Sequence, residues 1–100
     1  MTRSLLYLRA KPGCRDRLLA VFERLSVLAL ASGQPGFLGA ELHVPLDDGD
    51  EVLVTAAWAS AEHYEAWLAS PVREAMGEEL MPLLAAEPER RLYRAVETVS

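Results

Sequence analysis

The sequence lacks the long hydrophobic runs and the leader pattern that mark membrane and secreted proteins. Its apolar runs are far shorter than the roughly 20 residues that a transmembrane helix needs. Near the amino terminus, Arg9 and Lys11 interrupt the kind of apolar region that a signal peptide contains. We therefore expect no contact with a membrane and a cytoplasmic location.

Positive charge and cysteine are also scarce. The formal net charge is −5, and the local basic group Arg90, Arg91 and Arg94 is too small for a nucleic-acid surface, so we expect no nucleic-acid partner. The single cysteine, Cys14, excludes an internal disulfide and a zinc site built from cysteines. No glycine-rich phosphate loop and no nucleophile elbow is present. We expect neither a metal nor a cofactor.

What the chain does have is enough hydrophobic surface to fold. Of its 100 residues, 51% are hydrophobic and 25% are charged, which is typical of an ordered protein. This length suits one domain, and we expect that domain to span residues 1–100.

The spacing of apolar residues predicts seven segments. Apolar residues at steps of three and four predict helices, and short runs with alternating faces predict strands. The expected helices cover residues 14–32, 61–69 and 70–85, with Ser60 as an N-cap and the Ser70-Pro71 pair as a restart. The expected strands cover residues 4–10, 37–44, 51–59 and 92–99, and the turn sequence at 47–50 predicts a hairpin between the middle two.

This order of elements, β-α-β-β-α-β with a broken second helix, predicts an α+β ferredoxin-like plait. Both helices would cover one face of a four-stranded antiparallel sheet. Residues 4–10 and 51–59 are apolar on both faces, so the uncovered face would be a large exposed apolar surface. We therefore expect a homodimer formed through the sheet faces.

Alternation also assigns faces within the strand at residues 37–44. Leu38, Ala40 and Leu42 are expected on one face, and Glu41 with His43 on the other, toward the partner subunit. Glu41 and His43 alone are too few for a catalytic zinc site, which usually takes three protein ligands.

Three local motifs resemble the antibiotic-biosynthesis monooxygenase domain family. They are PGFLGAEL at residues 35–42, WASAEHY at 58–64 and WLASP at 67–71. The resemblance extends over nearly the whole chain. It implies a dimeric α+β barrel with a small-molecule pocket between sheet and helices. It also implies oxidation of phenolic or quinol-like compounds by O₂ without metal or flavin, although other members degrade haem.

Two branches of that family imply different site residues. The branch that oxidises anthrones resembles this chain at Trp58 and Tyr64, which would orient or stabilise a substrate oxyanion as the catalytic pair. Val54 stands where that branch has an asparagine. The haem-degrading branch would need an asparagine, a tryptophan and a histidine, and of the matching residues Leu6, Trp67 and Gly77 only the tryptophan is kept, which ranks haem degradation last.

Further residues are candidates for substrate binding, each with a structural alternative. Trp67 lies three residues after Tyr64 on one helix face, which suits either a pocket wall or plain core packing. Arg73 and Met76, one turn apart, would reach the pocket mouth, where Arg73 would hold an anionic substrate or pair with a neighbouring glutamate. Tyr7 would face either the helices or the partner subunit. The expected substrate-binding set is Trp67, Tyr7, Val54, Arg73 and Met76.

The sequence thus favours a cofactor-independent monooxygenase that acts on a small aromatic or quinol-like compound. The alternative is a non-catalytic dimeric module that binds a small apolar ligand.

Overall fold

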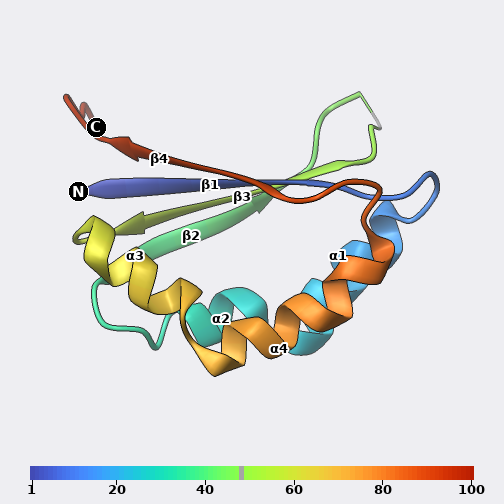
Figure 1. The fold of residues 1–100 in the computed structure, drawn as a ribbon. Coiled ribbons are helices and arrows are strands. Elements are labelled where there is room, and N and C mark those ends of the chain that lie inside the picture. The colour runs from blue at the N-terminus through green and yellow to red at the C-terminus, as the bar shows by residue number, and fades with distance from the viewer. Residues whose placement is uncertain (48) are drawn as a thin grey trace.

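The computed structural model describes residues 1–47 and 49–100 and contains one four-stranded sheet (Figure 1). The sheet order is β2-β3-β1-β4, and every neighbouring pair is antiparallel. The strands are β1 (Thr2–Arg9), β2 (Phe37–His43), β3 (Glu51–Trp58) and β4 (Glu89–Arg94). With β1 and β3 at the centre and helices in both crossovers, the predicted ferredoxin-like plait is confirmed.

The helices all lie on one side of this sheet (Figure 1). They are α1 (Arg15–Leu25), α2 (Val27–Ala31), α3 (Ala61–Leu68), α4 (Pro71–Leu80) and the 3₁₀ turn η1 (Met81–Leu83). Ser60 caps α3 as predicted, since its Oγ accepts a hydrogen bond from the His63 backbone N–H at 3.4 Å. No helix among the described residues is both long and apolar enough to span a bilayer.

The helix predicted over residues 14–32 is interrupted at Ser26. This residue is in the left-handed conformation, with φ 52° and ψ 45°, and it separates α1 from α2. Its N–H bonds to the carbonyls of Phe22 and Glu23, which closes α1. The prediction of one continuous helix was wrong because apolar residues recur on both sides of the break, and their spacing carries no trace of it.

A bulge at the start of β2 changes the faces that alternation predicted. Phe37 pairs with Trp58, but Gly39 already pairs with Ala57, so one extra residue lies in β2. Phe37 therefore packs edge-on against Trp58, with ring centroids 5.5 Å apart, while Leu38 is 59% exposed. The expectation that Leu38 shares a face with Ala40 was wrong. Ala40 lies on the helix side with Phe37.

The last strand begins earlier than predicted. It covers Glu89–Arg94 and not residues 92–99, with Glu89 opposite Tyr7 and Arg94 opposite Thr2. The first three residues of this strand are charged, and an edge strand tolerates them because its side chains are exposed. In this register Arg90 lies opposite Leu6 and therefore points to the helix side of the sheet.

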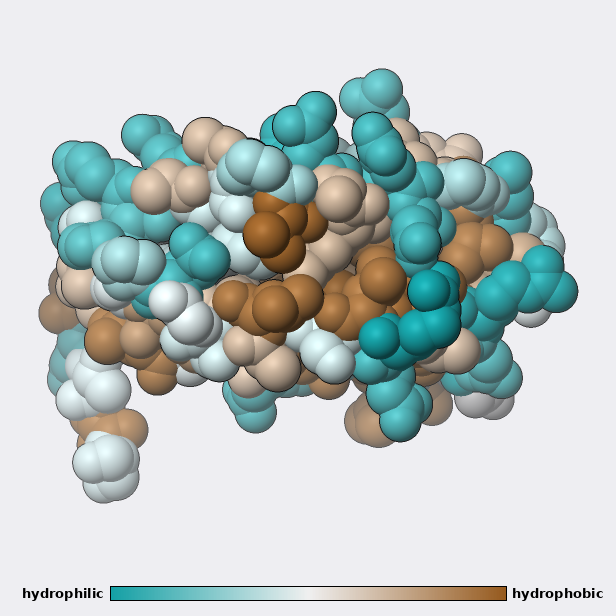
Figure 2. All heavy atoms as spheres, turned by 90° about the horizontal axis from the view of Figure 1, so that it is seen from below, coloured by the Kyte–Doolittle hydropathy of each residue, from teal (hydrophilic) through white to brown (hydrophobic). Residues whose placement is uncertain are grey.

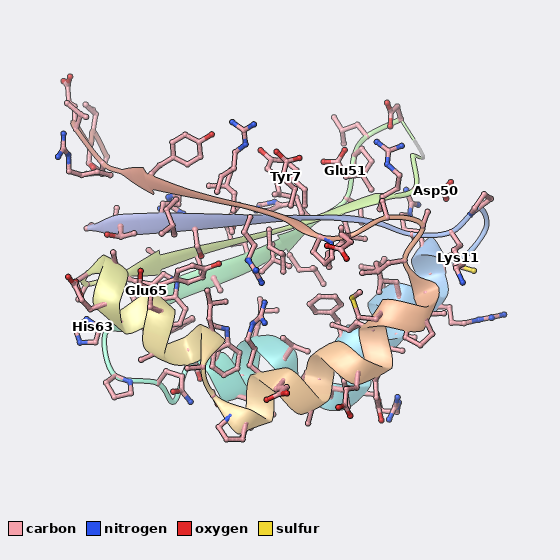
Figure 3. The ribbon with its side chains drawn as sticks, in the orientation of Figure 1. Tyr7, Lys11, Asp50, Glu51, His63 and Glu65 are labelled. Atoms are coloured by element: carbon pink, nitrogen blue, oxygen red, sulfur yellow. The ribbon has the colours of Figure 1, made fainter. Side chains whose placement is uncertain are left out.

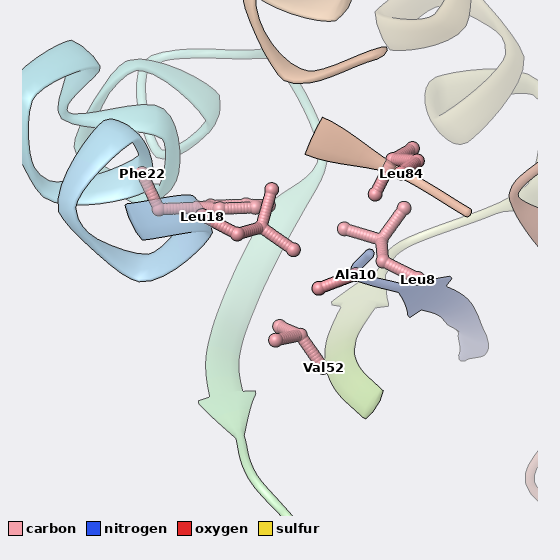
Figure 4. Packing of buried hydrophobic residues seen from close by; sticks show 6 residues of the cluster. All are labelled: Leu8, Ala10, Leu18, Phe22, Val52 and Leu84. Carbon is pink, nitrogen blue, oxygen red and sulfur yellow. The ribbon is translucent and has the colours of Figure 1, made fainter. Parts of the chain in front are cut away.

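The hydrophobic core is divided into two clusters along the sheet. One is a cluster of six buried residues that joins α1 to the ends of β1 and β3 (Figure 4): Leu8, Ala10, Leu18, Phe22, Val52 and Leu84. The other gathers aromatic residues at the opposite end: Ala31, Ala56, Trp58, Tyr64, Trp67 and Met76. The first cluster anchors the helix layer, and both clusters contribute to the candidate site, Leu8, Phe22 and Leu84 from the first and all six residues from the second.

The second face of the sheet has no helix over it. Tyr7 is on this face, directed away from the helices (Figure 3). Its neighbours there include Leu5 beside it on β1 and the cross-strand residues Leu53 and Thr55 of β3. His43 also belongs to this face, where its Nε2 lies 3.0 Å from Thr55 Oγ1. The open face is thus a central apolar band with polar groups around it.

Candidate functional site

A cavity of about 400 Å³ lies between the sheet and the helix layer. Its floor comes from the helix-facing residues of β1 and β3, and its roof from α2, α3 and α4. This volume is in the range of small-molecule sites. The predicted residues Val54, Trp58, Tyr64, Trp67, Arg73 and Met76 all line it.

Trp58 closes one end of the cavity and is 1% exposed. Its Nε1–H donates a hydrogen bond to Ser4 Oγ on β1 at 3.1 Å, and both groups are buried. Buried donors of this kind are normally satisfied within the fold. The expected role of this N–H toward a substrate oxyanion therefore does not match the geometry, because the group is already paired. The indole ring instead presents a flat apolar wall.

Tyr64 supplies the polar group that Trp58 does not. Its ring lies 5.9 Å from that of Trp58, and among the described residues no hydrogen-bond partner is found for its hydroxyl. Burial raises the pKa of the Tyr64 phenol, although the nearby cations Arg90 and Arg73 act in the opposite direction. The phenol is therefore neutral near pH 7, and its O–H is a donor that a ligand in the cavity can use.

Three predicted residues make the rest of the wall apolar. Trp67 and Met76, on α3 and α4, are 7% and 6% exposed. Trp67 shares its helix face with Tyr64, as the three-residue spacing predicted. Val54 faces the cavity from β3 beside Leu6, its partner across the strand pair. Neither Val54 nor Leu6 can hydrogen-bond a substrate carbonyl through its side chain, so this part of the floor selects only by shape.

Two arginines stand where the cavity opens to solvent. Arg73 comes from the first turn of α4 and is half-buried, and Arg90 reaches in from β4 and is exposed. Burial, and then the positive charge of Arg90, lower the pKa of Arg73. Arg90 was not among the predicted site residues, because nothing in the sequence indicates on which face of the sheet its side chain lies. Only the pairing of β4 with β1 reveals its direction.

The predicted residue Tyr7 and several other polar residues lie away from the cavity. Tyr7 points from the other face of the sheet, so the structure does not bring it to the other predicted substrate-binding residues (Figure 3). Glu41 and His43 are on that same open face. His63 lies on the outer side of α3, where its Nδ1 is 2.8 Å from Ser60 Oγ (Figure 3).

The position of His63 has a local structural reason. Gly36 has φ +78°, and a Cβ atom there would come within 2.2 Å of the His63 ring. The glycine, the imidazole and the Ser60 cap thus form one packed corner beside β2. This packing accounts for the position of the His63 ring without a catalytic role.

The residues that line the cavity also show whether it offers a ligand to haem iron. Leu6, Trp67 and Gly77, which match the haem-degrading signature, all line the cavity, so the positional match is sound. Neither His43 nor His63 is among the lining residues, and no lining residue offers an imidazole to iron. Within residues 1–47 and 49–100, no cluster of three or more His, Cys, Asp or Glu side chains could hold a metal ion.

Comparisons with known proteins agree with this architecture. The family model described as "Antibiotic biosynthesis monooxygenase" matches residues 1–79. No curated protein sequence matches the chain.

Solved structures match over nearly the full length. A protein of the antibiotic biosynthesis monooxygenase type from Chloroflexus aurantiacus is 27% identical, with a TM-score of 0.69 and 100% of both chains covered. A variant of SnoaB, a cofactor-independent oxygenase from Streptomyces nogalater, is 22% identical with a TM-score of 0.83, covering 98% of this chain and 95% of that one. A similar protein from Deinococcus radiodurans is 19% identical with a TM-score of 0.85, covering 100% and 97%.

Proposed function

The chain belongs to the antibiotic biosynthesis monooxygenase family, and on this premise we propose that it is a cofactor-independent monooxygenase. Its substrate would be a small aromatic or quinol-like compound, oxidised by O₂ inside the cavity. The observation that carries the proposal is the Tyr64 hydroxyl, a donor with no partner among the described residues, in a cavity that Trp58 and Trp67 also line. The resemblance in fold to SnoaB, a cofactor-independent oxygenase, supports the same class of reaction.

The reaction would use the substrate's own electrons. A phenolic compound with an activated methylene group loses a proton to give a carbanion, which transfers an electron to O₂ and then forms a C–O bond. The resulting peroxide loses water, so one oxygen atom becomes a quinone carbonyl and the other leaves as water with the two methylene hydrogens. Tyr64 donates a hydrogen bond to the substrate oxyanion that forms on deprotonation. The apolar walls keep water from the carbanion.

Oxygen uptake with a panel of anthrones and naphthoquinols tests this proposal. We expect turnover by the wild type and a fall in kcat of about 10²-fold or more for Tyr64→Phe, as for the loss of one oxyanion donor. Tyr93→Phe is the matched control, because Tyr93 lies on β4 outside the cavity. The kcat of this variant should equal that of the wild type. Equal rates in the wild type and Tyr64→Phe would overturn the role of Tyr64.

A specific observation also favours the non-catalytic alternative. Trp58 N–H is held by Ser4, and Val54 is apolar where a polar residue would assist, so the cavity has fewer donors than the anthrone-oxidising branch implies. Uptake that is absent with every compound, together with ligand binding in the cavity, would identify a binding module.

We further propose that a second copy of the chain covers the open face of the sheet. Leu5, Tyr7 and Leu53 form an apolar band there without any helix over it. At the edge of the sheet, Leu92 and Tyr93 of β4 are 43% and 48% exposed and point to opposite faces. Apolar surface of this kind is typical of a protein interface.

A further inference from the structure

We propose that the ligand of the cavity carries a carboxylate, which Arg73 and Arg90 bind together at the cavity mouth. The inference rests on the proposed function only in using the same cavity, and it names the chemical class of the molecule that enters. The ligand is then an amphipathic aromatic acid, with its ring system between Trp58 and Trp67 and its acid group toward solvent.

The first observation is that the two cations converge on one opening. Arg73 comes from α4 in the helix layer and Arg90 from β4 in the sheet, and both side chains line the cavity between these layers. The charges of both arginines lower the pKa of the Tyr64 phenol, and the charge of Arg90 lowers the pKa of Arg73. The three groups therefore lie within electrostatic range of one another. Two like charges at one site repel each other, and an anion between them removes that repulsion.

The second observation is that none of the carboxylates in the described part of the chain forms an ion pair with either arginine. Glu74 and Glu87 also line the mouth and are exposed. Yet none of the ion pairs found in residues 1–47 and 49–100 includes Arg73 or Arg90, and no carboxylate is among the causes that shift the Arg73 pKa. Arg24 and Arg91, by contrast, do pair with glutamates.

The third observation is the contrast between mouth and interior. Inside, the walls are Leu6, Val54, Trp58, Trp67 and Met76, which offer no charge. A flat aromatic body suits these walls, and a planar carboxylate suits the fork of a guanidinium, which can bind it through two parallel hydrogen bonds. An anion at the mouth and a ring inside use both parts of the site at once.

Calorimetric titration with a matched pair of probes tests the inference. 2-Naphthoate carries the carboxylate, and 2-naphthamide has nearly the same shape without the charge. We expect the wild type to bind naphthoate at least tenfold more tightly than naphthamide, and added salt to weaken only naphthoate binding. We expect Arg73→Gln and Arg90→Gln each to reduce this preference and the double variant to abolish it, while naphthamide binding stays unchanged.

Two further variants control for charge and for folding. Arg17→Gln removes the same charge from an exposed position on α1, outside the cavity, and should leave both affinities unchanged. Arg73→Lys with Arg90→Lys keeps both charges and should restore part of the preference. Circular dichroism checks that each variant is folded.

Each other outcome overturns the inference. These are equal affinity of the two probes for the wild type, no binding of either at millimolar concentration, or the same loss in Arg17→Gln as at the mouth. The test is separate from that of the monooxygenase. A preference for naphthoate without oxygen uptake would support the anion site and contradict the monooxygenase. Oxygen uptake without this preference would support the monooxygenase and contradict the anion site.

Discussion

Ser4 decides which polar groups of the cavity are free. By accepting the Trp58 N–H, it holds the indole ring against Phe37 and leaves Tyr64 as the neutral donor inside. No pattern in the sequence could have shown this, because Ser4 and Trp58 are 54 residues apart. Helical spacing did predict that Tyr64 and Trp67 share one helix face, whereas the strand that ends at Trp58 is apolar on both faces and its alternation assigns Trp58 to neither. Their partners depend on strand pairing, which is not local.

The acidity of Tyr64 gives a prediction at this scale. Because burial raises its pKa above the ordinary 10.0, the phenolate signal lost in Tyr64→Phe should have a midpoint above pH 10 when absorbance is followed during alkaline titration. Arg90→Gln should move this midpoint higher, since the cation favours the phenolate. Arg17→Gln is the control and should not move it.

The sign of the linked effect on stability follows from the same shift. Unfolded chains lose the phenol proton near pH 10 and the folded chain only at higher pH. The contribution of Tyr64 to stability is therefore fully present below pH 10 and is lost as the pH rises through the folded-state pKa. A Tyr64 midpoint at or below pH 10 would contradict the buried phenol.

At the scale of elements, the order of strands and helices was predictable and their interruptions were not. Apolar spacing located the helix layer, and the pair Ser70-Pro71 located the start of α4. The left-handed Ser26 was missed because the apolar spacing continues across it. The bulge after Phe37 and the start of β4 were missed because each is defined by pairing with a strand distant in sequence. The missed register of β4 is also why Arg90 was not predicted at the site.

Ser26 provides a prediction for the helix layer. A left-handed conformation costs a serine about 1–2 kcal/mol, and glycine adopts it freely. Ser26→Gly should therefore raise the free energy of unfolding by about 0.5–1 kcal/mol, after the greater entropy lost by glycine is subtracted. Urea unfolding measures this change. Ser32→Gly, where φ is −63°, should instead destabilise the protein. Destabilisation by both substitutions would contradict the break at Ser26.

At the scale of the whole molecule, the helices leave one face of the sheet open. If a second copy covers it, sedimentation at micromolar concentration should give twice the chain mass of 11.0 kDa. Leu53→Glu places a charge in the apolar band and should give the monomer mass, because an unpaired charge is costly to bury. Leu30→Glu, on the exposed side of α2, should not change the mass. A wild type that sediments as a single chain would refute the dimer.

The helix side of the molecule shows hydrophobic residues gathered across its middle, with hydrophilic residues around them (Figure 2). Leu30, Val72 and Met81 are the exposed large hydrophobic residues of the helix layer. They are few and come from three separate elements, α2, α4 and η1.

The placement of both tryptophans has a practical consequence. The chain has only Trp58 and Trp67, and each borders the same chamber, so nearly all of its intrinsic ultraviolet emission originates in the walls around a bound molecule. A quinone that enters would accept energy or an electron from either excited indole and quench that emission. The unlabelled protein is thus its own optical sensor, and its natural ligand can be sought by quenching, before any turnover is known.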